Sequence, residues 1–507
     1  MKNKSWFSQT VIFLSKHKTI VAICLIGIFL RAYKPLELFM YSHDQDLLSW
    51  FVKDVVTNHN LRLIGQETSV HGVFIGPLWY YTAIPFYLLT GMNPTGGLLL
   101  AIAVGGATVA SIYYVFSRMM NRVVGAIASL MYATSFYSVM TDREVVPTTP
   151  TILWSVWAFF TVFLFLKKRY RTAFILTGIL AGLIWHINMG LILIIPIIGL
   201  SYLVSFFQEK KKVAHLVSHR YGILMGLLLG LLMLSPYVLF EVRHNFVQTK
   251  SIFTSSSTAA TQTFMEKLDR TTTLASKNII GFTWGPYLNV QDKYPLFMVF
   301  ALLLFLIWKQ KVSKTFAAFM CFWLLLFIGF FSYNSLNLSE YYLNGMLVIQ
   351  LFILSSVFAY LIESKRFRFG GYFFLILFVI ANVTRLFTIP VNRSGYVDRV
   401  ALVQFIKADA LKHGYPCVSV SYITEPGFNL GYRYLYYVNN LRVSQPSSLA
   451  PVYTVVFPHS RVDRIDKSFG ALGLIYPDYN RYKPEAIATS CKGPDANLTD
   501  PLFGYVQ

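Results

Sequence analysis

The chain has 507 residues, of which 55% are hydrophobic and only 13% are charged. Soluble domains carry about 25% charged residues, so this composition excludes an ordinary soluble protein and indicates a membrane protein. The net charge of +21 could suit nucleic acid, but the basic residues lie in short clusters between apolar runs. That distribution is typical of a polytopic membrane protein, so we expect membrane lipid, and not nucleic acid, as a partner.

The first apolar run covers residues 19–30 and follows four lysines, Lys2, Lys4, Lys16 and Lys18. Arg31 and a polar segment come after this run, where a signal peptide would have a small-residue cleavage site. We therefore expect an uncleaved first transmembrane helix.

The stretch after this span is the most acid-rich part of the early chain. Ser42 and Gln45 have the spacing of a capping box, which predicts that a helix starts here. Apolar residues then recur at helical spacing from 47 to 56. Asp44 falls on the apolar face of this helix and Asp46 on the opposite side, so the two carboxylates are not expected to act as a pair.

Asp44 is the candidate catalytic residue. A carboxylate in the first turn of a helix interacts favourably with the helix dipole. An ionised carboxylate that faces protein or lipid suits a general base, which removes a proton from an incoming hydroxyl or amine. The alternative is a structural role as a cap, or in a salt bridge to Arg31 or Lys34.

Apolar segments of about 17–25 residues can cross a bilayer as helices. Such segments lie near 18–33, 96–117, 123–140, 148–166, 172–188, 190–207, 220–240, 295–309, 314–333, 342–362 and 370–389. A further run at 73–90 is ambiguous. If it does not cross, all the basic clusters fall on one side of the membrane, as the positive-inside rule requires. We therefore interpret 73–90 as a helix lying in the interface.

The predicted fold is a polytopic α-helical membrane protein with about eleven transmembrane helices and additional juxtamembrane helices. The transmembrane domain covers residues 1–390 and has two long outer loops, 34–95 and 241–294. We expect a cytoplasmic N-terminus and a location in the plasma (inner) membrane.

From residue 391 the composition changes to that of a small soluble domain, so 391–507 is predicted to be an extracytoplasmic α/β domain with a supporting role. Helices are expected at 397–412 and near 427–438, and strands at 417–423, 452–457 and 471–476. Cys417 and Cys491 could form a disulfide if this domain lies outside the cytosol, but their spacing alone leaves the pairing open.

The predicted topology gathers polar residues at the outer membrane surface, where ionisable side chains are costly and often functional. The candidate substrate-binding residues are Asp46, Arg143, His186, Asn188, Glu241, Arg243, His244 and Tyr342. The alternative for each is a residue in water at the end of a span.

Arg143, Arg243 and His244 could hold a phosphate leaving group, because cationic side chains suit phosphate oxygens. The alternative is pairing with neighbouring acidic residues. His186 and Asn188 flank a chain reversal, where polar residues often serve the ends of helices. No set of His, Cys and carboxylate residues has convincing metal spacing, so no metal site is assigned. A divalent cation as cofactor is left open.

Four segments together resemble a known family. They are 43–46, 63–69 with the following 76–81, 182–196 and 236–246. Their order resembles that of the C-type membrane glycosyltransferases, specifically family 39-like members akin to protein O-mannosyltransferases and the lipid A aminoarabinose transferase.

The resemblance implies inverting transfer of a sugar from a polyprenyl-phosphate donor to a protein, lipid or glycan acceptor at the outer membrane face. It implies that Asp44 is the catalytic base. The chain departs from the family in two places. Where the family has an aspartate followed directly by a glutamate, this chain has Asp44 followed by Gln45. Where relatives often have a Gln-x-His pair, this chain has His186-x-Asn188.

Two other functions remain open. A transporter or flippase of lipid-linked saccharides should show paired interrupted helices near the bilayer midplane, whereas the charged residues of this chain cluster at one face. A non-catalytic assembly partner would leave Asp44 dispensable.

Overall fold

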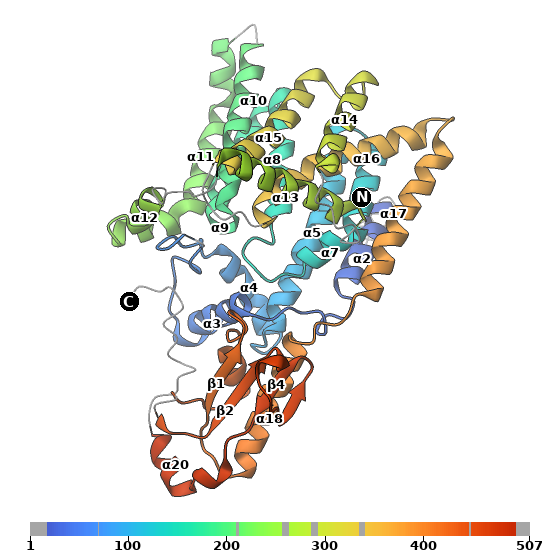
Figure 1. The fold of residues 1–507 in the computed structure, drawn as a ribbon. Helices are drawn as coiled ribbons and strands as arrows, with labels where there is room; N and C mark the ends of the chain where they lie inside the picture. The colour runs from blue at the N-terminus through green and yellow to red at the C-terminus, as the bar shows by residue number, and fades with distance from the viewer. Residues whose placement is uncertain are drawn as a thin grey trace, which may run out of the picture. The chain divides into compact units, whose positions relative to one another are not determined.

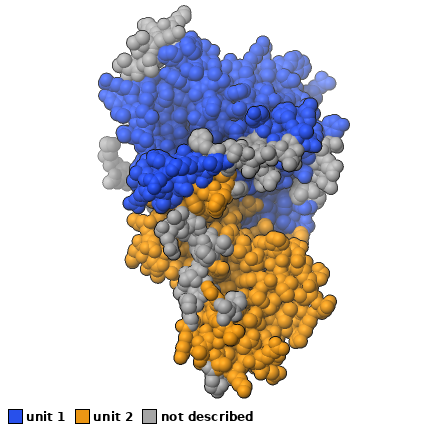
Figure 2. All heavy atoms as spheres, turned by 60° about the vertical axis from the view of Figure 1, so that its left-hand side comes forward, with its two compact units in different colours: residues 1–33, 102–143, 147–389 blue, residues 34–101, 144–146, 390–507 orange. Residues whose placement is uncertain are grey.

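The computed structural model describes residues 18–68, 70–208, 212–255, 263–284, 293–333, 340–445 and 448–492. Lys2, Lys4, Lys16, Ser69 and parts of the predicted outer loop 241–294 lie outside these residues. The described chain is mostly helical, with a small sheet near its C-terminal end (Figure 1). It divides into two compact units, which are coloured blue and orange in Figure 2.

The first unit consists of residues 1–33, 102–143 and 147–389. Its helices are α2 (Lys18–Arg31), most of α5 (Thr95–Met119), α6 (Arg122–Thr134), α7 (Phe136–Thr141), α8 (Thr151–Leu166), α9 (Tyr170–Ile187), η1 (Met189–Ile194), α10 (Ile195–Phe207), α11 (Lys212–Arg243), α12 (Val247–Ser255), α13 (Phe264–Trp284), α14 (Tyr294–Trp308), α15 (Lys314–Tyr333), η3 (Glu340–Met346), α16 (Leu347–Glu363) and α17 (Arg368–Thr388). Each predicted apolar span coincides with one or two of these helices.

Among the described residues, seven helical segments are long and apolar enough to cross a membrane. They are Thr95–Met119, Tyr170–Ile187, Met189–Phe207, His219–Arg243, Lys314–Tyr333, Glu340–Glu363 and Arg368–Thr388. Three shorter apolar helices, α6, α8 and α14, accompany them. The prediction of a multi-pass helical membrane protein is confirmed, and the number of crossings stays a prediction.

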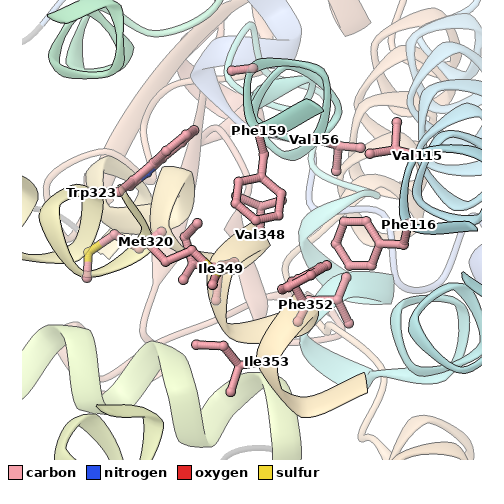
Figure 3. Packing of buried hydrophobic residues seen from close by; sticks show 14 of the residues in the cluster. Val115, Phe116, Val156, Phe159, Met320, Trp323, Val348, Ile349, Phe352 and Ile353 are labelled. Carbon is pink, nitrogen blue, oxygen red and sulfur yellow. The ribbon is translucent and has the colours of Figure 1, made fainter. Parts of the chain in front are cut away.

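The core of the first unit is built from large aromatic and aliphatic side chains (Figure 3). Phe352 of α16 lies edge-on to Phe116 of α5 and to Phe159 of α8, with ring centroids 5.3 and 5.2 Å apart. The indole of Trp323 on α15 lies in the same core and donates a hydrogen bond to the carbonyl of Gly345 at 3.1 Å. These side chains pack helices α5, α8, α15 and α16 against one another. Edge-on aromatic pairs add to the stabilisation that comes from the buried apolar area.

Helices α9 and α11 approach each other so closely that only glycine fits at the crossing. A Cβ atom on Gly178 would lie 1.8 Å from the carbonyl oxygen of Gly226, and one on Gly226 would lie 2.3 Å from that of Phe174. Small residues at a contact let two membrane helices bring their backbones together, which increases van der Waals packing where lipid offers no hydrophobic driving force.

The second unit consists of residues 34–101, 144–146 and 390–507. Its elements are α3 (His43–Asn58), α4 (Leu78–Leu89), the start of α5, α18 (Tyr396–Lys412), β1 (Ser419–Thr424), α19 (Arg433–Val438), β2 (Val452–Phe457), η5 (His459–Arg461), β3 (Lys467–Phe469), β4 (Leu472–Ile475), η6 (Tyr479–Arg481) and α20 (Pro484–Ser490). The last segment of this unit begins at Pro390, and the unit also includes residues of the first outer loop, so the predicted domain division at 391 stays a prediction.

The sheet of the second unit has the strand order β1-β2-β4-β3. Strands β1 and β2 are parallel, with Val420 opposite Tyr453, whereas β2–β4 and β4–β3 are antiparallel. Helix α18 packs against β3 and β4. The three predicted strands are present, but β3 was not predicted, because three residues with a lysine and a serine carry too little apolar pattern to be recognised.

The structure adds two features of the C-terminal segment that the sequence alone could not establish. Cys417 and Cys491 form a disulfide, with Cα atoms 5.6 Å apart. The helix expected near 427–438 is reduced to α19, since Gly427 and Gly431 both have positive φ and break the helical path.

Candidate functional site

Helix α3 begins where the sequence predicted. The side-chain oxygen of Gln45 accepts hydrogen bonds from the backbone N–H of Ser42 at 2.8 Å and from its hydroxyl at 2.9 Å. The first of these bonds and the approach of the Gln45 backbone N–H to the Ser42 side chain make up the capping box. It fixes the start of the helix, so that Asp44 and Asp46 both lie in the first turn, where the helix dipole favours negative charge.

The side chain of Asp44 is partly exposed, and a side-chain amide holds one of its two carboxylate oxygens. Gln66 Nε2 donates to Asp44 Oδ1 at 3.0 Å. Within the described part of the chain this is the only hydrogen bond of the Asp44 carboxylate. Oδ2 is therefore left available to an incoming group, as a general base requires.

Gln66 lies on a short antiparallel turn whose backbone is held on both sides. Gly65 N–H donates to the Ile75 carbonyl at 2.7 Å, and Ile75 N–H donates back to the Gln66 carbonyl at 3.0 Å. Glu67 and Phe74 form the next bridge of the pair. The turn places the Gln66 side chain next to the start of α3. Segment 63–69, which carries the family resemblance, therefore contacts segment 43–46.

The apolar face of α3 is buried as expected, but the side that carries Asp46 is buried as well. Asp46 is 3% exposed, and its Oδ1 accepts hydrogen bonds from the Tyr434 backbone N–H at 3.0 Å and from the Tyr41 hydroxyl at 3.2 Å. Helical spacing places Asp46 on the side of α3 opposite the apolar face, and that side is covered because α19 packs against α3. A substrate-binding role for Asp46 stays a prediction, while the contacts seen are structural.

One of the alternatives for Asp44 was a salt bridge to Arg31, but Arg31 pairs with a different carboxylate. This arginine is fully buried in the first unit and donates from Nε and Nη2 to Asp142 Oδ2, at 2.9 and 2.6 Å. The neighbouring Arg143 is also buried and donates from Nη1 to the Tyr33 carbonyl at 2.7 Å. Arg143 therefore contacts the end of the first span, and its predicted contact with a phosphate is untested.

His186 and Asn188 lie at the reversal between α9 and η1, and both are buried. His186 Nε2 lies 2.8 Å from the Met233 carbonyl of α11. Asn188 caps η1, because its Oδ1 accepts from the Gly190 N–H at 2.9 Å. Tyr342 approaches the same turn, since a Cβ on Gly190 would lie 3.5 Å from Tyr342 Cδ1. These contacts agree with the alternative of helix-end roles for His186 and Asn188.

Glu241, Arg243 and His244 lie at the C-terminal end of α11. Glu241 is buried and accepts from the backbone N–H groups of Gln248 and Thr249 at 3.1 and 3.0 Å, so it caps the start of α12. His244 stacks on the Phe240 ring with centroids 4.0 Å apart. Arg243 is exposed and makes no hydrogen bond or ion pair within the residues that the structure describes.

The predicted site residues belong to two units. Asp44 and Asp46 lie in the second unit, and the other seven lie in the first. Over the described ranges, no group of three or more His, Cys, Asp or Glu side chains comes together as a metal site would require.

Gln66 and Tyr80 were not recognised as site residues from the sequence. Both lie in segments that carry the family resemblance, but nothing in their spacing shows that a glutamine twenty-two positions after Asp44 would bond to its carboxylate. The only signal was the strongly polar character of 66–68 beside an aromatic helix start.

Comparison with known proteins supports the class of protein expected from these motifs. The family described as dolichyl-phosphate-mannose-protein mannosyltransferase matches residues 75–240. None of the curated proteins compared with the chain matches it. Among solved structures, ArnT from Cupriavidus metallidurans bound to undecaprenyl phosphate is similar, with 11% identity, a TM-score of 0.53, and coverage of 91% of this chain and 98% of that chain.

The same ArnT in the apo state has 10% identity and a TM-score of 0.54, and the match covers 95% of this chain and 100% of that chain. At this identity the likeness shows the fold. The chain thus has the fold of ArnT over nearly its whole length, and its resemblance to the C-type membrane glycosyltransferases is confirmed.

Proposed function

We propose that this protein transfers a sugar from a polyprenyl-phosphate donor to an acceptor at the outer face of the plasma (inner) membrane, with inversion and with Asp44 as general base. The observation that carries the proposal is the Asp44 carboxylate, which is partly exposed at a helix start and, among the described residues, is held at one oxygen only. The family match over 75–240 and the fold shared with a protein solved bound to undecaprenyl phosphate support a lipid-phosphate donor.

In the proposed reaction, an acceptor hydroxyl or amine attacks the anomeric carbon of the donor sugar. Asp44 Oδ2 takes the proton from the attacking atom as the new bond to the sugar forms. The bond between the anomeric carbon and the phosphate oxygen breaks, and the polyprenyl phosphate leaves with its electron pair. A single displacement of this kind inverts the anomeric centre and forms no covalent adduct with the enzyme.

The leaving phosphate carries negative charge and needs a cationic contact. Arg243 suits this role best among the predicted cations, because its guanidinium is exposed and makes no ion pair within the described residues. Arg143 is buried against the Tyr33 carbonyl and His244 is stacked on Phe240, so both have protein contacts of their own. We assign them secondary roles at the phosphate.

The disulfide Cys417–Cys491 supports a location of the C-terminal segment outside the cytosol. Disulfides persist in oxidising compartments and are rare in the cytosol. A C-terminal segment outside the cytosol agrees with the positive-inside argument, which places α3 and the turn at Gln66 on the outer side as well.

The test is transfer of radiolabelled sugar from polyprenyl-phosphate donors in purified membranes, with wild type compared with Asp44→Asn. Loss of a general base lowers the rate by about 100- to 10,000-fold. Asp478→Asn is the matched control, because this carboxylate is exposed on the C-terminal domain and its hydrogen bond and ion pair within the described residues are local, to Asn480 and Arg481. Full transfer by Asp44→Asn would refute the base, and no transfer by wild type from any donor would refute the glycosyltransferase function.

A further inference from the structure

We infer that Gln66, held by Tyr80, is a positioning residue that orients the Asp44 carboxylate for proton transfer. The inference rests on the proposed function and goes beyond it, because it assigns roles to two residues outside the predicted catalytic set. All three side chains belong to the second unit.

The hydrogen bonds of the Tyr80 hydroxyl determine which way the Gln66 amide points. The hydroxyl accepts from the Gln66 backbone N–H at 3.1 Å and donates to Gln66 Oε1 at 3.0 Å. Because Oε1 accepts the hydroxyl proton, Nε2 is the atom that remains to face Asp44, and it donates to Oδ1 at 3.0 Å. An amide flip would place Oε1 against Asp44 Oδ1, two acceptors that cannot bond to each other.

Tyr80 itself has little freedom to move. Its side chain is 1% exposed, and its ring stacks on Phe51 of α3 with centroids 4.7 Å apart. The ring also lies against Gly65, where an added Cβ would come within 2.2 Å of Tyr80 Cε2. A glycine beside Gln66 therefore lets the ring reach the turn.

This arrangement leaves the two carboxylate oxygens unequal. Oδ1 receives a neutral amide donor, and Oδ2 receives none from the described residues. An amide donor restrains the rotation of the carboxylate and requires Oδ1 to act as an acceptor, without adding a competing positive charge. Oδ2 is thus directed to the acceptor substrate. Orientation of a reacting group by a fixed neighbour is a recognised contribution to rate.

The experiment compares Gln66→Leu and Tyr80→Phe with wild type in steady-state transfer from a polyprenyl-phosphate sugar donor in membranes. Hydrogen bonds to charged groups support an expected fall in kcat of ~10- to 100-fold for Gln66→Leu. KM for the donor should change less than about twofold, because uniform binding is not altered. Tyr80→Phe keeps the ring and its stacking on Phe51, so it should show a smaller fall in kcat with the same KM.

Tyr81→Phe is the matched control. The Tyr81 hydroxyl accepts from the Arg62 N–H at 2.8 Å and donates to the Arg62 carbonyl at 2.9 Å, so it holds the same loop from the same helix without touching Gln66. If Tyr81→Phe lowers kcat as much as Tyr80→Phe does, the effect comes from loop stability and the inference fails.

A second arm separates positioning from general stability. In an Asp44→Asn background, Gln66→Leu should lower the residual rate by less than about twofold, since residues that act as a unit are not additive. Wild-type kcat in Gln66→Leu, together with loss of transfer in Asp44→Asn, would overturn this inference and leave the proposed function intact. Absence of transfer in wild type would overturn both.

Discussion

Arg31 of α2 and Asp142 after α7 form an ion pair in which both side chains are almost completely buried, with Arg31 Nη2 2.6 Å from Asp142 Oδ2. Arg31 also donates to the carbonyls of Gly27 and Ala133, and the Tyr132 hydroxyl donates to Asp142 Oδ1 at 2.8 Å. Every strong donor and acceptor of the pair therefore has a protein partner. That network fixes the first span against the end of α7.

Breaking one half of this pair should destabilise the first unit. Removal of one partner from a buried ion pair costs about 3–5 kcal/mol, because the other charge stays buried without compensation. We expect Asp142→Asn and Arg31→Met each to lower the unfolding temperature in detergent, and the double variant to lower it by less than the sum. An additive double variant would show that the two side chains do not act together.

A second prediction concerns whether Asp46 is structural. Asp46→Ala leaves the Tyr434 N–H without its acceptor in a buried place, which costs about 1–3 kcal/mol. Asp46→Asn keeps an Oδ1 acceptor for both Tyr434 and Tyr41, so it should retain most of the stability and most of the sugar transfer. Unfolding temperature and transfer rate are measured together. Loss of transfer in a stable Asp46→Asn protein would favour contact with the substrate instead.

The two aspartates also show where sequence reasoning ends. The capping box of Ser42 and Gln45 was visible because it depends on residues three apart. The surroundings of Asp44 and Asp46 could not be predicted, because the partner of Asp46 is Tyr434, nearly four hundred positions later in the sequence. Helical periodicity describes a helix with one apolar side, whereas the first turns of α3 are covered on more than one side.

The same limit explains the other outcomes. The spans and the C-terminal strands β1, β2 and β4 were predictable, because continuous or alternating apolar runs are local signals. The roles of His186, Asn188 and Glu241 at helix ends depend on partners in other turns, and the bond from Gln66 to Asp44 depends on a loop returning to a helix start. Such contacts produce no periodic pattern in a single sequence, so they could not be predicted from it.

The contact between α9 and α11 gives a third prediction. Gly178→Ala places a methyl group where the Gly226 carbonyl oxygen lies, so the helices must move apart. We expect a loss of about 1–3 kcal/mol from overpacking. Gly199→Ala on α10 is the control, since no atom of the described residues lies within 4 Å of its added Cβ and alanine is the better helix former. Thermal unfolding in detergent should separate the two variants, and equal unfolding temperatures would argue against the close crossing.

A fourth prediction uses the disulfide to test topology. Cys417 and Cys491 should react with a membrane-impermeant maleimide on intact cells only after reduction, because their thiols are bonded to each other. The two free cysteines of the described chain, Cys24 and Cys321, lie in helices α2 and α15 and are not expected to react from outside. A Cys417→Ser/Cys491→Ser protein should therefore show no labelling. Labelling of Cys417 only after the cells are opened would place the domain on the cytoplasmic side.

The last prediction concerns the pH dependence of the loop that leads from α3 to Gln66. Burial raises the pKa of Asp54, but hydrogen bonds from Asn58, Arg62 and Asn60 and the positive charge of Arg62 outweigh burial and hold the pKa of this carboxyl below its ordinary value. A carboxyl with a lowered pKa in the folded protein contributes stability that is fully present above the unfolded pKa of about 3.9.

That contribution is lost as pH falls through the lower pKa of the folded state, because the proton then removes the charge that the three donors stabilise. Wild type should therefore be more stable than Asp54→Asn at pH 6, and the gap between their unfolding temperatures should close as pH falls through and below about 3.9. Comparison with the variant cancels the titration of the other carboxyls. A gap that stays constant from pH 6 to the acid limit would mean that the Asp54 charge does not hold the loop.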